Sequence, residues 1–148
     1  MKVLEISTEK EYVVEIALCT QSDLRSFGKR RYFFDWTVEK EVYKLVLKGS
    51  GDVLGLISLE RIPSEWRIHI RLLTVSKENK GQDKVYDRIA GNLIAHASKI
   101  AVREYGADAC ISLVPKTSIV QHYIDKYNMQ KTGKTLSMVV PELLDLLM

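Results

Sequence analysis

The chain has 148 residues, of which 46% are hydrophobic, 28% charged and 8% aromatic, and its formal net charge is +3. This composition excludes a disordered, collagenous or disulfide-scaffold protein, and the small positive charge argues against a dedicated nucleic-acid binder. No apolar run approaches the roughly 20 residues of a transmembrane helix, and the start lacks a signal-peptide core. We therefore expect one cytoplasmic globular domain over residues 1–148, with no membrane partner.

The N-terminal segments give two interpretations. Residues 3–6 favour a short strand. Ser7-Thr8 followed by Glu11 resembles a capping box, which would start a helix, whereas the alternation of apolar residues over 12–18 favours a strand. Residues 29–36 read Lys-Arg-Arg-Tyr-Phe-Phe-Asp-Trp, basic and then aromatic, and follow no clear period.

An antiparallel meander is expected next. Alternating residues predict strands over 42–47, 53–62 and 66–75, joined by the turn sequences Gly-Ser-Gly-Asp at 49–52 and Pro-Ser-Glu at 63–65. On the third strand the apolar side chains face one way and the polar ones the other. The apolar set is Ile68, Ile70 and Leu72, and the polar set is Arg67, His69 and Arg71. The alternation breaks at Leu72-Leu73, which suggests a bulge.

The C-terminal half alternates helices and strands. Apolar residues at helical spacing predict a long helix from Tyr86 to Arg103, which Gly106 ends. Residues 109–114 predict a buried strand. A capping box at 118–121 predicts a second helix, followed by a last strand over 136–140 and a short apolar tail helix from Pro141.

The two cysteines, Cys19 and Cys110, have neither metal-ligand nor redox spacing. Free cysteine commonly behaves as a small buried hydrophobe. We expect both to be structural, in a reducing compartment, and we expect no metal site.

The order of elements from Val42 to Val140 resembles that of the GCN5-related N-acetyltransferase family. Its most specific residues are Leu72-Leu73-Thr74-Val75, the Lys80-Gly81 loop, the Ala-rich helix, Ile111-Ser112-Leu113-Val114-Pro115 and His122-Tyr123…Tyr127-Asn128-Met129. The resemblance implies an α/β fold with a mixed, mostly antiparallel central sheet and helices on both faces. It also implies an acyl-CoA-dependent N-acyltransferase that transfers an acetyl or other acyl group to a small-molecule or peptide amine by direct attack.

The resemblance also implies a cofactor site on backbone groups. An unpaired strand end can hydrogen-bond the pantetheine arm, and the loop before a helix N-terminus can bind a diphosphate. The residues in these places are Leu73, Thr74 and Val75 on the strand, then Lys80, Gly81, Gln82, Lys84 and Arg88. The family's loop pattern, Gln/Arg-x-x-Gly-x-Gly/Ala, fits either at Lys80-Gly81 without a second glycine, or with Gly91 as the closing residue. In both alignments the loop is longer than in the family.

Candidate catalytic residues follow from the same resemblance. Tyr123 is the nearest match to the family's acid, with a core aromatic as its alternative role. The strand position of the family's base holds Arg71, which cannot accept a proton. His69 on the same face is the candidate base, the alternative being an exposed strand histidine. Glu60 is the fallback, and we expect structural or surface roles for His96 and His122.

Two rival functions stay open. One is a domain of this fold without transferase activity that acts as a binding or sensor module. The other is a nucleic-acid-associated protein that uses the basic and aromatic residues 29–36, although we expect no nucleic-acid partner from the net charge. The apolar residues 143–148 would dock on their own domain or on a second copy, which leaves a homodimer open.

Overall fold

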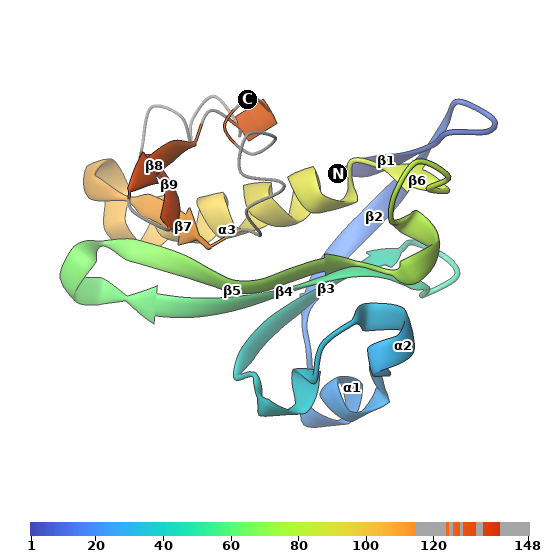
Figure 1. Cartoon of the computed structure of the whole chain (residues 1–148), viewed down its shortest axis with the longest axis horizontal. Helices are drawn as coiled ribbons and strands as arrows, with labels where there is room; N and C mark the ends of the chain where they lie inside the picture. Colours follow the sequence, from blue (N-terminus) through green and yellow to red (C-terminus); the bar gives the residue numbers. More distant parts are fainter. Residues whose placement is uncertain (115–123, 125, 128, 133–134, 140–148) are drawn as a thin grey trace. The chain divides into compact units, whose positions relative to one another are not determined.

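The structure is a computed structural model that describes residues 1–114, 124, 126–127, 129–132 and 135–139. The strands are β1 (Lys2–Glu5), β2 (Lys10–Leu18), β3 (Glu41–Leu47), β4 (Val53–Ile62), β5 (Arg67–Val75), β6 (Tyr86–Asp87), β7 (Cys110–Leu113), β8 (Gln130–Thr132) and β9 (Thr135–Val139). The helices are α1 (Gln21–Ser26), α2 (Lys29–Tyr32) and α3 (Ile89–Tyr105), with 3-10 turns η1 (Trp36–Val38), η2 (Pro63–Glu65), η3 (Lys77–Asn79) and η4 (Gly106–Asp108) (Figure 1).

These elements form a mixed α/β protein, which confirms the predicted fold class. The strands are hydrogen-bonded in the order β6-β1-β2-β3-β4-β5-β7-β9-β8, and β5–β7 is a parallel pair. The predicted meander is confirmed, since β3, β4 and β5 lie within one residue of their predicted bounds. Among the described residues, no helix is both long and apolar enough to span a bilayer.

The contacts divide the chain into two compact units that are interleaved in sequence. The first contains residues 1–58 and 72–94, and the second contains residues 59–71 and 95–148. The chain passes from one unit to the other inside β4, β5 and α3. The single domain expected over residues 1–148 stays a prediction.

The segment after residue 6 is a strand, so the helix interpretation is wrong and the strand interpretation is confirmed. β2 pairs antiparallel with β1 on one side and β3 on the other. The Thr8 hydroxyl donates to the Glu5 carboxylate at 2.5 Å and accepts from the Lys10 N–H at 3.3 Å, so it stabilises the hairpin turn. β1 pairs with residues 10–13 and β3 with residues 14–18, so every residue of β2 is in a ladder. These ladder hydrogen bonds outweigh one local cap.

A capping box does form at the start of α1. The Thr20 hydroxyl accepts from the Asp23 N–H at 3.1 Å, and the Asp23 carboxylate accepts from the Thr20 N–H at 2.9 Å. Leu24, Tyr32 and Trp36 then pack into one buried cluster with residues of β3 and β4. The aromatic half of segment 29–36 therefore belongs largely to the core.

In the first unit, helices cover both faces of β4. Leu56 packs in the cluster with Leu24 and Trp36. A Cβ built on the neighbouring Gly55 would lie 2.7 Å from Ile89 and 3.0 Å from Leu93, both on α3. Adjacent strand residues point to opposite faces, so α1 and α2 lie across β4 from the first turns of α3 (Figure 1).

In the second unit, β7 joins β5 to β9. β7 runs parallel to β5 and antiparallel to β9, and β8 pairs antiparallel with β9. The apolar residues that alternate along β5, β7 and β9 are buried: Ile68, Ile70, Ile111, Leu113, Leu136 and Met138. The predicted strands over 109–114 and 136–140 are confirmed, whereas β8 was not predicted.

The long helix begins later than the sequence predicts. Tyr86 and Asp87 form β6, paired antiparallel with Leu4 and Glu5 of β1, and α3 starts at Ile89. Arg88 lies between β6 and α3 and has a φ of 75°, which is incompatible with a right-handed α-helix. Gly106 has a φ of 60° and follows the last helical residue, as predicted. Ile124, Lys126 and Tyr127 are helical, whereas most of the predicted 118–127 helix and the tail from Pro141 lie outside the described residues.

Candidate functional site: a strand end, a stapled loop and the start of α3

The far end of β5 lacks the partner strand that its first half has. The parallel ladder with β7 runs from Arg67 opposite Cys110 to Ile70 opposite Leu113 and ends there. β5 continues to Val75, and none of its residues from 71 onward pairs with β7 in the described part of the chain. Leu73 and Val75 are half-buried and Thr74 is buried, its hydroxyl donating to the Val75 carbonyl at 3.0 Å.

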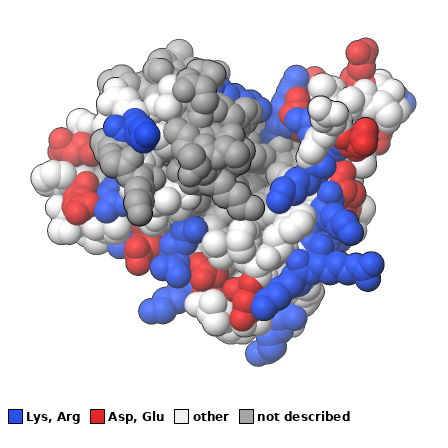
Figure 2. Space-filling model, viewed as in Figure 1, with Lys and Arg blue, Asp and Glu red and all other residues white. Residues whose placement is uncertain are grey.

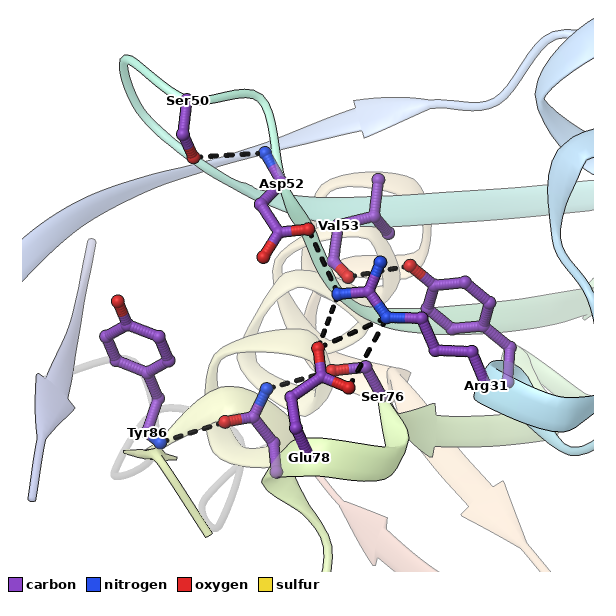
Figure 3. Close-up of polar contacts among 9 residues, drawn as sticks. Arg31, Ser50, Asp52, Val53, Ser76, Glu78 and Tyr86 are labelled. Atoms are coloured by element: carbon purple, nitrogen blue, oxygen red, sulfur yellow. Dashed lines mark hydrogen bonds and ion pairs between the residues drawn. The ribbon is translucent and has the colours of Figure 1, made fainter.

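The loop between β5 and α3 is held by one buried side chain. Asn79 is 3% exposed, and its amide nitrogen donates to the Ser76 hydroxyl at 2.8 Å. Its side-chain oxygen accepts from the Tyr86 N–H, also at 2.8 Å (Figure 3). The Ser76 N–H donates to the Leu54 carbonyl on β4 at 2.8 Å. The loop therefore leaves β5 and reaches β6 in a fixed conformation.

The turn after Asn79 leaves open space beside the backbone. Gly81 has a φ of 86°, and a Cβ built there would meet no atom within 4 Å. Gln82 beside it is exposed. A backbone that is uncovered on one side can approach a ligand closely.

The three loop cations predicted to bind the cofactor already have partners. The Lys80 ammonium lies 4.1 Å from the centre of the Phe33 ring. Lys84 Nζ is 3.0 Å from an Asp87 carboxylate oxygen, which also accepts from the Arg88 N–H at 2.9 Å. The Arg88 guanidinium pairs with Glu11 at 3.2 Å. A diphosphate would compete with these exposed or half-exposed pairs, which are individually weak.

A hydrogen-bonded cluster surrounds His69 in the second unit. Its Nδ1 lies 2.8 Å from the Ser112 hydroxyl and 3.4 Å from Arg67 Nη1, and Arg67 Nη1 donates to Ser112 Oγ at 2.7 Å. Glu65 accepts from Arg67 Nε at 2.8 Å. Burial lowers the pKa of His69, and the nearby Arg67 lowers it further. The ring is therefore neutral near pH 7.

The hydrogen-bond pattern assigns the tautomer of this neutral ring. Arg67 can only donate, so its N–H facing Nδ1 disfavours a proton on that nitrogen. Ser112 Oγ accepts from Arg67 and can donate its own hydrogen to Nδ1. His69 therefore carries its proton on Nε2.

The sequence matches no family model, and it matches no curated protein significantly. Solved structures do match. Nourseothricin acetyltransferase is 10% identical over 85% of this chain and 98% of its own, with a TM-score of 0.61. N-acetylglutamate synthase from Neisseria gonorrhoeae, complexed with coenzyme A and N-acetyl-glutamate, is 15% identical over 88% of this chain and 36% of its own, with a TM-score of 0.65. AtaT, complexed with acetyl-methionyl-tRNAfMet, is 13% identical over 92% of this chain and 100% of its own, with a TM-score of 0.59. This chain has the fold of the GCN5-related N-acetyltransferases.

The first unit brings together all the residues that the sequence predicts at the cofactor of this acetyltransferase fold. They lie on the end of β5, in the stapled loop and at Arg88, just before α3. α3 starts at Ile89, so Gly91 lies two residues into the helix and Gly81 lies in the loop before it. The loop from Ser76 to Arg88 is long because it includes η3 and β6.

The predicted catalytic residues of the acetyltransferase fold are only partly described. Tyr123 and His122 lie outside the described residues. His69 lies on β5 in the second unit. Glu60 lies on β4 in the same unit, and its carboxylate is 3.9 Å from Arg71. Among the described residues, no three His, Cys, Asp or Glu side chains gather to hold a metal ion. Burial raises the pKa of Cys19 to about 12 and also raises that of Cys110, so both thiols stay protonated and are poor nucleophiles.

Four residues of these clusters were missed from the sequence. Asn79 and Asp87 looked like ordinary polar loop and helix residues, and nothing local indicates that they fix the loop. Ser112 did carry a signal, because it is the only hydroxyl in the apolar stretch 109–114. Glu39 is 5% exposed and accepts a hydrogen bond of 2.6 Å from Ser58, and a carboxylate is so rarely buried that its position cannot be predicted from composition.

Proposed function

We propose that this chain is an acyl-CoA-dependent N-acyltransferase that transfers an acetyl group to a primary amine by direct attack. The observation that carries the proposal is the end of β5, where pairing with β7 stops at Ile70 and the strand continues to Val75. Its free edge offers backbone groups that a pantetheine arm can hydrogen-bond as an additional strand would. The similarity to solved acetyltransferases supports the same activity.

The residues around this strand end fit the cofactor. Leu73, Thr74 and Val75 would bind the pantetheine amides through their backbone. Gly81 and Gln82 would lie beside the diphosphate, where the bare backbone at Gly81 permits close approach. Lys80, Lys84 and Arg88 would supply positive charge, together with the first N–H groups of the 17-residue helix α3. Asp87 now accepts from Lys84 and from the Arg88 N–H, so binding would require these groups to exchange partners.

The proposed reaction needs no covalent enzyme intermediate. The neutral amine nitrogen attacks the thioester carbonyl and forms an N–C bond, after which the C–S bond breaks. The amine loses one proton and the coenzyme A thiolate gains one. Tyr123 is the proposed donor of that second proton, as the resemblance implies. Both protonated cysteines are unsuited to a covalent route.

His69 is the proposed acceptor of the amine's proton, and its hydrogen bonds determine which ring nitrogen can accept it. With the proton on Nε2, His69 has no lone pair on that nitrogen to accept a second proton. Only the tautomer protonated on Nδ1 can accept there, and its Nδ1–H would donate to Ser112 Oγ. Ser112 is thus the proposed positioning residue for His69. Ser112→Ala should change the pH profile of kcat, whereas a purely structural role would change only stability.

Binding of acetyl-CoA tests the proposal most directly. At a hundredfold excess over the dissociation constant, a ligand that binds only the folded chain stabilises it by about 2.7 kcal/mol. A thermal-shift titration should therefore raise Tm, and combined Lys84→Ala and Arg88→Ala should reduce the affinity. Lys48→Ala, also an exposed ion-paired lysine, is the matched control. Absence of any shift at saturating acetyl-CoA would refute the proposal.

Turnover separates transferase activity from the alternative. A non-catalytic acyl-CoA-binding module is favoured by Arg71, which occupies the family's base position and pairs with Glu60. Thiol release should be measured across amino acids, diamines and peptides with free N-termini. A thermal shift with acetyl-CoA but no thiol release with any amine would support the module. The similar structures do not select the acceptor, because their bound molecules range from N-acetyl-glutamate to an acetylated tRNA.

A further inference from the structure

A basic hollow lies between α2 and η3 in the first unit. Its volume is about 460 Å³, and its walls are formed by Arg30 and Arg31 from α2 and by Lys77 and Glu78 from η3. The two elements lie far apart in the sequence but contact each other. Lys and Arg side chains gather over this region on the face shown in Figure 2.

One wall of the hollow is held rigidly by Arg31. Its Nη2 donates to Asp52 at 3.0 Å and to Glu78, and its Nε donates to Glu78 at 3.2 Å. Figure 3 shows the guanidinium between the two carboxylates. Arg31 lowers the pKa of Glu78, so this carboxylate is ionised, and the same guanidinium also pairs with Asp52. One positive charge thus faces two carboxylates, and the other two cations of the hollow lie outside this network of ion pairs.

Those other cations are Arg30 and Lys77. Both are exposed, and neither side chain makes a hydrogen bond or an ion pair within the described ranges. Two like charges that border one hollow repel each other, and a bound anion would relieve the repulsion. The net charge of +3 does not reveal these two cations, because it sums 22 Lys and Arg against 19 Asp and Glu over the whole chain.

The aromatic side chains of the same segment do not line the hollow. Tyr32 is 5% exposed and Trp36 is fully buried, and both pack in the core cluster. The Phe33 ring is stacked by the Lys80 ammonium. Phe34 is exposed, but it is not among the lining residues. Nucleobase binding uses aromatic platforms, and within the described residues none lines the hollow, which is therefore suited to recognise charge rather than bases.

We propose that this hollow binds a phosphate group. Two unpaired cations match a group with up to two negative charges better than they match a carboxylate. The guanidinium of Arg30 can also make paired hydrogen bonds to phosphate oxygens. The phosphate belongs either to a small phosphorylated molecule or to the backbone of a nucleic-acid strand. Lys77 and Glu78 belong to the same loop as the proposed cofactor residues, but none of those residues lines the hollow, so a measurement of acetyl-CoA affinity separates the two sites.

Binding to the full chain can be measured with two probes. Inorganic pyrophosphate is titrated by calorimetry, and a labelled single-stranded RNA of about 12 nucleotides by anisotropy. The test variant combines Arg30→Ala and Lys77→Ala, and its control combines Lys10→Ala and Lys40→Ala, which remove two exposed lysines outside the hollow. All four side chains are exposed, so both variants should keep the wild-type Tm. As a second variant, Arg30→Glu reverses one charge.

The expected result is a loss of at least about tenfold in affinity for one probe in the test variant, none in the control and a larger loss in Arg30→Glu. If RNA is that probe, the slope of log K against log salt should fall by about 1.4, and the source is a nucleic-acid strand. If only pyrophosphate responds, the source is a small molecule. Equal affinity in all variants, or no binding of either probe, overturns the proposal. Weaker acetyl-CoA binding in the test variant also overturns it, because the hollow would then belong to the cofactor site.

Discussion

The side-chain oxygen of Asn79 accepts a hydrogen bond from the backbone N–H of Tyr86 at 2.8 Å. The same side chain donates to Ser76 at the other end of the loop. One buried amide thus spans the connection from β5 to β6, just before α3. The conformation of the proposed diphosphate loop depends on this residue, although it carries no charge.

Asn79→Ala should therefore destabilise the fold and loosen the loop. The half-buried Tyr86 N–H would lose its partner, and the buried Ser76 hydroxyl would lose the donor that Asn79 gives it, which together cost about 1–3 kcal/mol. Urea unfolding should report this loss, and acetyl-CoA affinity should fall with it. Gln21→Ala is the control, since that amide is exposed and lies on α1, outside the loop. Equal effects of the two variants on acetyl-CoA affinity would show that Asn79 has no special role.

Gly55→Ala should disturb the packing of α3 against β4. The new methyl would lie 2.7 Å from Ile89, 3.0 Å from Leu93 and 3.0 Å from the Thr74 carbonyl, and the last of these is backbone that cannot turn aside. Overpacking of this kind costs about 1–3 kcal/mol. Chemical denaturation should detect it. Gly28→Ala is the matched control, since no atom lies within 4 Å of its Cβ position and its φ is −70°. We expect its effect to be smaller, and the reverse order would contradict this packing.

His69 should make the stability of the fold depend on pH. Burial and Arg67 lower its folded pKa below the ordinary value of 6.5, partly against the attraction of Glu60. Below pH 6.5 the unfolded chain takes up a proton more readily than the folded chain, so protonation favours unfolding. The free energy of unfolding should fall on acidification through this range. The difference between wild type and His69→Gln, measured by denaturation at several pH values, isolates this contribution. A difference that is flat or rises toward acid would mean that the ring is not held neutral.

Ser58→Ala should destabilise the protein by removing a partner of a buried carboxylate. The Ser58 hydroxyl donates to Glu39 at 2.6 Å, and the two residues are 0% and 5% exposed. Loss of a hydrogen bond to a buried charged group costs about 1.5–3 kcal/mol. Thermal unfolding should show a lower Tm, whereas exposed Ser64→Ala should leave it unchanged. A wild-type Tm in Ser58→Ala would mean that the bond contributes nothing.

Much of the fold could be predicted from local patterns. The alternation over 42–75 places β3, β4 and β5, because one buried face imposes a period of two. The predicted helix end at Gly106 is confirmed for a similar reason, since a left-handed residue after the last turn suits glycine. The start of α3 could not be predicted in the same way, because Tyr86 and Asp87 fit the helical period and are drawn into a strand by β1.

The sequence by itself determined the strand pattern, the position of the long helix and the resemblance of the β5-to-α3 region to an acyl-CoA site. These features depend on residues close together in the chain, where side-chain period and turn chemistry act directly. Only the tertiary structure decided that Ser7-Thr8 closes a hairpin, that Asn79 staples the loop, and that Arg30 and Lys77 border one hollow. Each of these depends on groups that strand pairing or helix packing brings together. A backbone group or a charged side chain forms its hydrogen bond or ion pair with the group that the fold places next to it.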